Sequence, residues 1–405
     1  MRRALLTIVL PMLCAAPAVA AKVELTHLRA PTPYVEVRGL SAGPFRPLLW
    51  QRGTLHWVQD ARWPILPPAP GPLRNIYAPT VVPIRSGYRI YFGGWDGSQT
   101  PNDRLYTATT DPEFQSISPH QLTVDHGRFV HVNNCSAVRL QNGTTYIAAT
   151  CYPDEAGTNK PALFVSKDGV RFGAATPYAP TKADLVPIHG YESFADADIN
   201  GMNALLREDG VWRLYFGDFH QFGKVYRATS RDARTFQYDG PVLDAALMVN
   251  DVHQFVFGGQ RWSLMLLHHN DQRLSYTLST TSAHFPPAST LFQAAGNDDR
   301  YIVAVGLVTD GRRALGVLYG AGAVPSLDQN RIFARWLQKR AQFEASGRDL
   351  AADGRALGPD RLRFPVPPGV TRGRFVVYDE DGATRLYEGP EVELRQGQVW
   401  TFRRG

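Results

Sequence analysis

The sequence contains little cysteine and lacks the short motifs that mark several common enzyme classes. It has only three cysteines in 405 residues, and its Cys and His residues do not have the spacing of a zinc-binding motif. It also lacks a phosphate-cradling glycine loop and a GxSxG elbow around a nucleophilic serine. The sequence therefore gives no support for a zinc-motif, P-loop or serine-hydrolase function.

Long runs of basic residues or of apolar residues are also scarce. The formal net charge is +6, but the Lys and Arg residues are scattered and do not form the aromatic-interleaved basic runs that track nucleic acid. Beyond the N-terminal segment, no apolar run is long enough to span a bilayer. The sequence therefore predicts neither a nucleic-acid partner nor stable membrane insertion, and it leaves the oligomeric state open.

The N-terminus has the pattern of a secretory signal peptide. Arg2 and Arg3 precede an uncharged run that ends near Ala16, and small residues follow up to Ala20. We expect residues 1–20 to be a signal peptide, cleaved after Ala20, and the mature chain to be periplasmic or secreted. An ordinary buried N-terminal helix is the alternative.

Export would place Cys135 and Cys151 in an oxidising compartment. They flank a hairpin whose turn contains Asn142-Gly143, so their sulfur atoms fall nearly opposite one another. A three-residue turn pairs Cys135 with Cys151, whereas a two-residue turn pairs Cys135 with Thr150. A disulfide is therefore one of two open outcomes.

A repeated pattern of three strand-like stretches organises most of the chain. Each copy has an apolar stretch after a small polar cluster, an aromatic-rich stretch after a glycine turn, and a third stretch ending in Ser/Thr-rich residues and Phe. The copies are Tyr77–Phe114, Asn134–Phe172, Asn203–Phe236, Asp251–Phe285 and Tyr301–Phe343. Radial arrangement of these copies predicts five blades, and a β-sandwich is the rival arrangement.

Turn residues separate the first two stretches of every copy and favour short strands over helices. The turn signals are Ser86-Gly87, Asn142-Gly143, Asp209-Gly210, Gly258-Gly259 and Asp310-Gly311. We predict an all-β fold with a five-bladed β-propeller over residues 75–345. A segment over residues 21–74 would wrap the propeller and could close its ring, and residues 346–405 would form a small C-terminal all-β appendage.

Propeller geometry brings two sets of residues to one end of the central channel. The start of each first strand lies at the same end as the loop that returns from the second strand to the third. Carboxylates, imidazoles, amides and an indole fall at these positions. They include Trp95 and Asp96, Asn134, Asn200 and Asn203, Asp218 and His220, Asp251 and His253, His268 and His269, and Asp298 and Asp299.

The repeat resembles that of the five-bladed furanosidase-type propellers, the superfamily of glycoside hydrolase families 32, 43, 62, 68, 117 and 130. The resemblance covers roughly residues 75–345. YAPTVV followed by YRIYFGG is similar to the innermost-strand signature of that superfamily, and SKDGVRF is similar to its blade ending. The repeat is specific for the fold and not for a reaction, so no single family is assigned.

The resemblance implies paired carboxyl groups in the central funnel, one acting as acid and one as base or nucleophile. Asp251 stands at an entry position and is the predicted base, although it could serve only to bend the chain beside Asn250. Glu192 is the predicted acid, and Asp198 is the other candidate for the second carboxyl. The chain departs from the family pattern at entry positions where an Asp is expected, which hold Ala78, Thr80 and Asn134.

Further positions are predicted to bind the glycan. Trp95 beside Asp96 suits the stacking of an indole against a sugar ring. No cofactor and no metal ligand set are expected, and a structural cation in the funnel is left open. The other binding candidates are Asn134, Asn203, His220, His253 and Asp299.

The leading prediction is an exported carbohydrate-active enzyme, a glycoside hydrolase with a glycan or oligosaccharide substrate. A propeller that binds glycan without cutting it is the first alternative, favoured by the missing carboxylates. A glycoside phosphorylase is the second, and it would need cationic side chains in the funnel. Two funnel carboxyls about 5–10 Å apart would indicate hydrolysis, whereas one carboxylate ringed by amides and aromatics would indicate binding.

Overall fold

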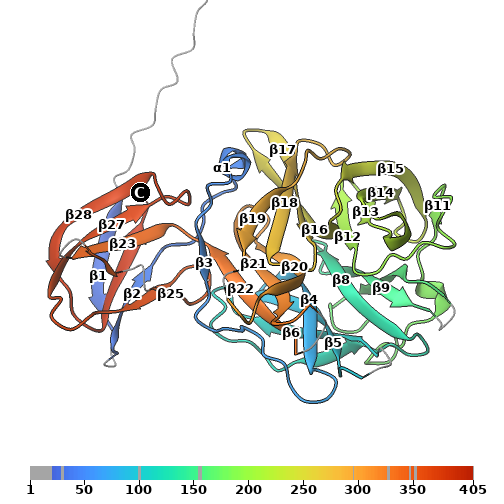
Figure 1. Ribbon diagram of the computed structural model, residues 1–405, viewed down its shortest axis with the longest axis horizontal. Coiled ribbons are helices and arrows are strands. Elements are labelled where there is room, and N and C mark those ends of the chain that lie inside the picture. Colours follow the sequence, from blue (N-terminus) through green and yellow to red (C-terminus); the bar gives the residue numbers. More distant parts are fainter. Residues whose placement is uncertain are drawn as a thin grey trace, which may run out of the picture.

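The fold is all-β, as the sequence predicts, and the strands of the described residues form seven sheets. Five sheets make up the larger body on the right of Figure 1, and two make up a smaller body on the left. The described part of the chain contains no helix long and apolar enough to cross a membrane. The predicted signal peptide lies outside it. The computed structural model describes residues 21–28, 32–98, 102–153, 157–294, 296–325, 329–345, 348–350 and 354–404.

Each sheet of the larger body is built on one repeat of the sequence. The first contains β4 (Asn75–Ile84), β5 (Gly87–Trp95), β6 (Arg104–Thr110) and β7 (Gln121–Val124). The second contains β8 (His131–Arg139), β9 (Thr145–Tyr152) and β10 (Lys160–Ser166). The third contains β12 (Asn203–Glu208), β13 (Val211–Phe216), β14 (Lys224–Ser230), β15 (Phe236–Asp244) and the short edge strand β11 (Ile188–His189).

The last two sheets follow the same order. The fourth contains β16 (Met248–Phe257), β17 (Gln260–His268), β18 (Arg273–Ser279) and β19 (Ser289–Gln293). The fifth contains β20 (Tyr301–Thr309), β21 (Ala314–Gly322), β22 (Arg331–Leu337) and, from the N-terminal segment, β3 (Trp57–Gln59). The described helices are short: α1 (Pro47–Arg52), η1 (Lys182–Asp184) and η2 (Phe219–Gln221).

The strands form where the sequence alternates apolar and polar residues between turns. In β5, Tyr88 and Ile90 are buried while Arg89 between them is partly exposed, which is the two-residue period of a strand. Each predicted turn signal lies between the first and second strands of its sheet. Local sequence therefore explains the hairpins of every sheet in the larger body.

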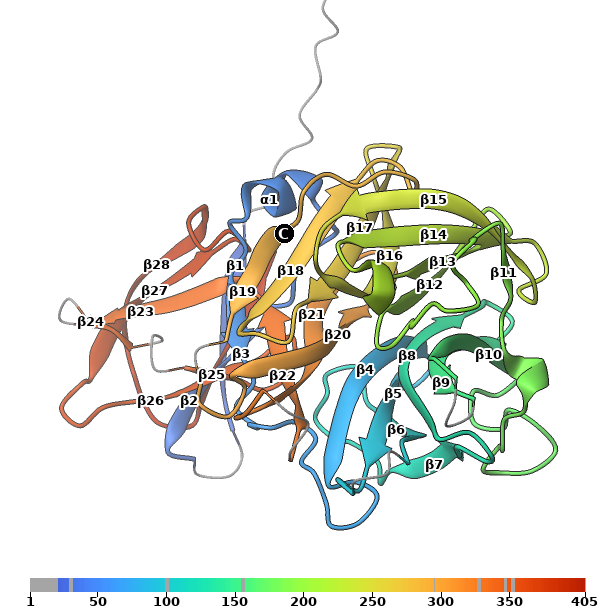
Figure 2. The ribbon, with the colours of Figure 1, turned by 45° about the vertical axis from the view of Figure 1, so that its right-hand side comes forward.

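The first strands of the five sheets lie side by side at the centre of the larger body (Figure 2). β4, β8, β12, β16 and β20 contact one another in chain order, and β20 also contacts β4. Side chains of Thr80, Ser136 and Asp251 each accept a hydrogen bond from the backbone of the next first strand. The donors are the N–H groups of Ala137 at 3.1 Å, Leu205 at 3.0 Å and Leu307 at 2.8 Å, respectively. The five sheets are not joined by backbone ladders, so these side chains provide hydrogen-bond acceptors for N–H groups at the sheet edges.

Residues that precede the first repeat complete the fifth sheet. β3 pairs antiparallel with β22. Asp60 follows β3, is fully buried, and accepts hydrogen bonds from Trp336 Nε1 at 2.7 Å and from Gly358 N at 3.0 Å. At the contact of β20 with β4, a Cβ on Gly306 would lie 2.3 Å from the backbone oxygen of Pro79, so this close approach requires glycine.

The smaller body consists of two sheets around a separate apolar core, which includes Val37, Phe343 and Trp400. One sheet contains β1 (Lys22–His27), β29 (Gln398–Arg403), β2 (Tyr34–Arg38), β26 (Leu362–Pro365) and β25 (Arg355–Ala356). The other contains β24 (Arg348–Asp349), β23 (Arg340–Ala345), β27 (Arg372–Tyr378) and β28 (Arg385–Glu393).

The smaller body differs from the predicted domain boundaries at both ends of the chain. β1 and β2 come from the segment 21–74 that was predicted to wrap the propeller, and β23 begins at Arg340, inside the predicted propeller range 75–345. The physical reason is burial, because Val37 of β2 packs in the same core as Phe343 of β23. Pairing between such distant segments leaves no periodic signal in the sequence.

Cys135 and Cys151 are both buried and free, so they do not form the disulfide that the sequence left open. β9 places Cys151 opposite Val132 of β8. A register shift between Asn133 and Ser136 puts Cys135 in a bulge, without a paired residue on β9. The two turn lengths considered from the sequence both assumed a regular ladder, and the bulge removes that assumption.

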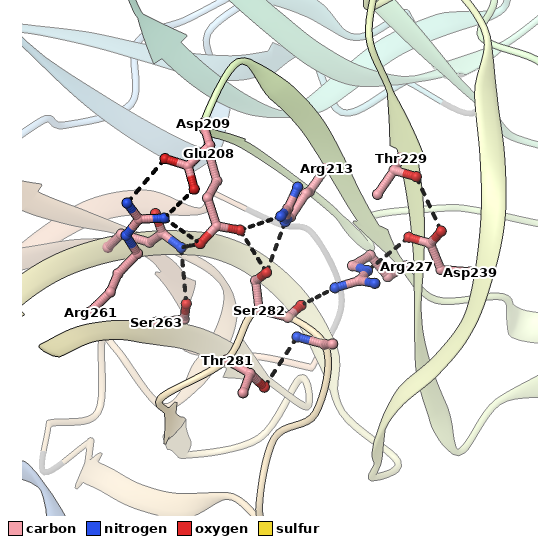
Figure 3. A network of polar contacts seen from close by, with 12 residues as sticks. Glu208, Asp209, Arg213, Arg227, Thr229, Asp239, Arg261, Ser263, Thr281 and Ser282 are labelled. Carbon is pink, nitrogen blue, oxygen red and sulfur yellow. Dashed lines mark hydrogen bonds and ion pairs between the residues drawn. The ribbon is translucent and has the colours of Figure 1, made fainter.

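A partly buried carboxylate ties the third sheet to the fourth (Figure 3). Glu208, at the end of β12, pairs with Arg213 at 2.5 Å and with Arg261 of β17 at 3.2 Å. Its Oε2 also accepts a hydrogen bond from the Ser282 hydroxyl at 2.7 Å. Burial opposes ionisation, but the hydrogen bonds from Gln254 and Ser282 and the charge of Arg213 outweigh it and hold the pKa of Glu208 below its usual value.

We expect Glu208→Gln to destabilise the protein more than Asp209→Asn, although both carboxylates pair with Arg261. The side chain of Glu208 is 10% exposed and that of Asp209 is 69% exposed. The expected losses in the free energy of unfolding are about 1–3 kcal/mol for the partly buried Glu208 and about 0–1 kcal/mol for the exposed Asp209. Urea denaturation measures both, and equal losses would contradict the role given to Glu208.

The same interaction predicts a pH dependence. The pKa of Glu208 is lower in the folded chain than its ordinary value of 4.5. Its contribution to stability is therefore complete above the ordinary pKa and is lost as the pH falls from about 4.5 through the folded-state pKa. The stability difference between the wild type and Glu208→Gln should shrink over that acid range.

Candidate functional site

A cavity of about 290 Å³ opens in the larger body at the end where the first strands begin. This is the end to which propeller geometry assigns the two sets of predicted site positions. Side chains from four of the first strands line it: Tyr77, His131, Met248 and Val303. Others are the last residues of second strands, Trp95 and His268, or lie in the return loops, Asp103 and Phe219.

The pairing of the first strands with the second strands is irregular near the cavity, and this irregularity changes the direction of nearby side chains. A bulge bends a strand and redirects its side chains, and Ala78 and Asn134 adopt the left-handed φ values of 50° and 46° at two of these places. Four of the five first strands therefore enter the centre of the body with a kink. The register shifts lie between Tyr77 and Thr80, Asn133 and Ser136, Val249 and Asp251, and Ile302 and Ala304.

Asp103 is the carboxyl-bearing residue among the described residues that line the cavity. It lies in the return loop just before β6, and its side chain is only 5% exposed. Burial raises the pKa of the Asp103 carboxyl to about 7, against opposing hydrogen bonds from its own backbone and from the Asn133 side chain. At mildly acidic pH, Asp103 is therefore a neutral acid that can donate a proton.

The imidazole of His131, which faces Asp103 in the cavity lining, is oriented by a chain of hydrogen bonds that we call the histidine relay. The relay consists of His131, Asn159 and Asp198. His131 Nδ1 lies 3.6 Å from Asp103 Oδ2, and His131 Nε2 lies 2.6 Å from Asn159 Oδ1. Asn159 donates to Asp198 Oδ1 from its side-chain Nδ2 at 2.6 Å and from its backbone N at 3.1 Å.

The relay fixes which ring nitrogen of His131 carries the proton. Because Asn159 gives its amide hydrogens to Asp198, it presents its carbonyl oxygen to the ring and accepts a hydrogen bond from Nε2–H. The Nδ1 lone pair then faces the carboxyl of Asp103. Burial lowers the pKa of His131, partly offset by the hydrogen bond to Asn159, so the ring stays neutral.

A second imidazole in the cavity wall is also neutral. His268 is 2% exposed, and its Nδ1 lies 2.6 Å from Asn250 Oδ1. Burial lowers the pKa of His268 to about 3. The described lining contains neither Arg nor Lys. No described group of three His, Cys, Asp or Glu residues is placed to hold a metal ion.

The three predicted catalytic carboxylates are not brought together in the described cavity lining. Asp251, the predicted base, is 2% exposed, accepts from Leu307 N, and lies 2.9 Å from His253 Nε2 through the same Oδ2. Glu192, the predicted acid, is exposed on the segment between β11 and β12. Asp198 belongs to the histidine relay. Catalytic roles for Asp251 and Glu192 therefore find no support in their positions.

Two of the predicted binding residues, Trp95 and Asn134, line the cavity. The others are not among the described lining residues, and each makes hydrogen bonds within the protein. These contacts join Asp96 to Ser98 and Asn102, Asn203 to Asn134 and Thr150, His220 to Asp196, His253 to Asp251, and Asp299 to Tyr319.

Sequence reasoning missed Asp103, His131 and Asn159. Asp103 ends the return loop that begins at Trp95, so applying the geometric rule to the whole loop would have found it. His131 begins β8, a little ahead of the entry position assigned to Asn134, because the bulge lengthens that entry. Asn159 carries no sequence signal, since its role depends on contact with Asp198 from another loop.

The arrangement is a cavity in an all-β body with one protonatable carboxyl among its described lining residues. No family model and no curated protein matches the chain. Among solved structures, a Bacteroides thetaiotaomicron protein given provisionally as a glycosidase is 12% identical, with TM-score 0.50 over 72% of this chain and 99% of that chain. A protein solved in a complex with RGII is 10% identical, with TM-score 0.51 over 72% of this chain and 95% of its own length.

A further similar structure is the catalytic domain of a GH62 α-L-arabinofuranosidase from Coprinopsis cinerea. It is 13% identical, with TM-score 0.49 over 71% of this chain and 97% of that chain. The similar structures include glycoside hydrolases and a member of the GH130 family of mannoside phosphorylases. At these identities the likeness concerns the fold, and the reaction has to be argued from the site.

The hydrogen bonds of His131 and His268 predict which ring nitrogen of each imidazole carries the proton. We expect ¹⁵N NMR to find His131 protonated on Nε2 and His268 protonated on Nδ1, because their partners are the amide oxygens of Asn159 and Asn250. Asn159→Ala should convert His131 into a mixture of tautomers, while His268 stays unchanged as an internal reference. An Nδ1-protonated His131 in the wild type would contradict the relay.

The position of Asp251 predicts a structural role. Asp251→Ala leaves the Leu307 N–H unpaired between β16 and β20, so we expect a loss of about 1–3 kcal/mol in the free energy of unfolding. Asp251→Asn keeps an acceptor oxygen and should lose less. Urea denaturation of the two variants tests this, and an alanine variant as stable as the wild type would exclude the role.

Proposed function

We propose that this chain is an exported enzyme with a five-bladed propeller that cleaves a glycan bound in the cavity. The five repeats, the ring of contacts between first strands and the glycosidase-type fold support the propeller. Trp95 and Phe219 offer aromatic faces to sugar rings, and Asn134 offers an amide to their hydroxyl groups. The observation that carries the proposal is the buried, protonatable carboxyl of Asp103.

In this proposal Asp103 is the general acid. It transfers its proton to the glycosidic oxygen as the bond from that oxygen to the anomeric carbon breaks. The Nδ1 atom of His131 lies 3.6 Å from the carboxyl, and burial favours the protonated form of Asp103 by raising its pKa. Since an effective acid has a pKa near the working pH, a pKa of about 7 suits Asp103 to this step.

Hydrolysis also requires a group that activates water. Asp198 is partly exposed and is connected to Asp103 through His131 and Asn159. Asp198 does not belong to the described cavity lining, so it serves to orient Asn159, and no described carboxylate is assigned to activate the water. Water adds its hydroxyl to the anomeric carbon and releases its other proton to solvent, from which Asp103 regains the proton that it gave to the leaving oxygen.

Binding without cleavage is the second candidate function. One carboxyl among amides, imidazoles and aromatics in the described lining favours it, as do Ala78 and Asn134 at positions where the related propellers are expected to carry carboxylates. Phosphorolysis is less well supported, because the described lining has no cationic side chain to hold phosphate.

Reducing-sugar release from arabinan, xylan, fructan and bacterial surface glycans tests the enzyme. We expect Asp103→Asn to lower turnover by about 10²–10⁴-fold with little change in substrate binding. Asp232→Asn, an exposed carboxylate in a turn of the third sheet, is the matched control and should keep full turnover. Since the acid must be protonated, activity should fall as the pH rises above about 7.

The outcomes separate the candidates. Full turnover by Asp103→Asn rejects Asp103 as the acid. A wild type that binds one of these glycans but releases no sugar rejects cleavage in favour of binding. A wild type that neither binds nor cleaves any of them rejects a glycan-directed function.

A further inference from the structure

Two aromatic side chains are exposed beside the cavity. Phe219 and Phe222 are each 40% exposed. Their rings stack at a centroid distance of 5.8 Å and an interplanar angle of 19°, and Phe222 lies 6.0 Å from the ring of His269. Large aromatic rings grouped on a surface commonly mark a binding site. We call Phe219, Phe222 and His269 the rim platform.

The segment that carries the two phenylalanines is held rigidly. The Asp218 side chain is fully buried and accepts a hydrogen bond from His220 N at 2.9 Å, capping η2. The Phe219 N–H donates to the backbone oxygen of Asp198 at 3.0 Å. The Gln221 side chain donates to a hydroxyl on the segment between β11 and β12. A rigid platform loses little conformational entropy when a ligand packs on it.

The rim platform is continuous with the cavity, because Phe219 belongs to both. Two residues of the cavity lining, Tyr77 and Trp95, each have a polar atom, the hydroxyl and Nε1 respectively, that is buried without a hydrogen-bond partner in the described structure. Tyr77 is 2% exposed. Unpaired buried donors cost free energy, so these two groups indicate a ligand with hydroxyl or other acceptor oxygens. An aromatic surface that leads into such a cavity matches a chain of sugar units, each with apolar C–H faces and hydroxyl edges.

We propose that the rim platform binds sugar units that extend out of the cavity, so that the ligand is an oligosaccharide chain and not a single sugar. This inference rests on the proposed glycan-directed function and adds a second subsite to it. Phe222 separates the two subsites experimentally, because it belongs to the platform while Phe219 also lines the cavity.

Saturation-transfer NMR can test the subsite with defined probes. The probes are arabinose, xylose, mannose and fructose, each as the monosaccharide and as the tetrasaccharide of the matching polymer. For the sugar that binds, we expect the wild type to prefer the tetrasaccharide by about two- to tenfold. Phe222→Ala should abolish this preference and leave monosaccharide binding unchanged.

Control variants keep the test specific. Phe222→Tyr retains a ring and should keep the preference, whereas Phe222→Leu retains apolar bulk without a ring and should lose most of it. Val256→Ala is the matched surface control, because Val256 is 71% exposed on β16 and does not line the cavity. Circular dichroism verifies that each variant is folded.

Each outcome decides the inference. An unchanged preference in Phe222→Ala and Phe222→Leu overturns the platform while leaving the cavity site intact. A wild type that self-associates through this surface, with a monomeric Phe222→Ala, shows that a second copy of the chain covers it and also overturns the inference. A wild type that binds none of the probes, short or long, overturns the platform together with the proposed function.

Discussion

The contacts among the five first strands constrain the rest of the larger body. Each of these strands is an edge strand of its own sheet. The side of its backbone that faces away from that sheet therefore has N–H and C=O groups with no ladder partner. Thr80, Ser136 and Asp251 satisfy three N–H groups on neighbouring first strands, and Gly306 permits the approach at the contact of β20 with β4. These contacts set how closely the strands approach one another and therefore the width of the cavity at one end.

This constraint explains why an acidic residue on a first strand need not be a catalytic group. Asp251 occupies a position where the family resemblance leads us to expect a functional carboxylate, yet its Oδ2 is used by Leu307 N and His253. Loops are freer to vary because they take no part in these strand contacts. The chemical groups of the cavity accordingly come from strand starts and return loops, with Asp103 in the loop after β5.

Much of the fold could be predicted because its signals are local. Glycine turns and two-residue alternation determine each hairpin, as in Tyr88, Arg89 and Ile90 of β5. The features that could not be predicted depend on distant contacts or ladder irregularities. The bulge at Cys135 breaks the register that a disulfide needs, and Val37 packs with Phe343, far away in the chain. For the site, the sequence located the right end of the body and four lining residues, Trp95, Asn134, Asn200 and His268, but not Asp103.

The protonation states of the cavity argue for an uncharged ligand, although the whole chain has a formal net charge of +6. Asp103 is neutral below a pH of about 7, and His131 and His268 are neutral because burial lowers their pKa values. With no Arg or Lys in the described lining, an anionic sugar would be desolvated there without a compensating charge, which is costly. A neutral sugar has no such cost, since amides and indole can satisfy its hydroxyl groups. The uncharged lining is therefore consistent with the neutral glycan of the proposed function.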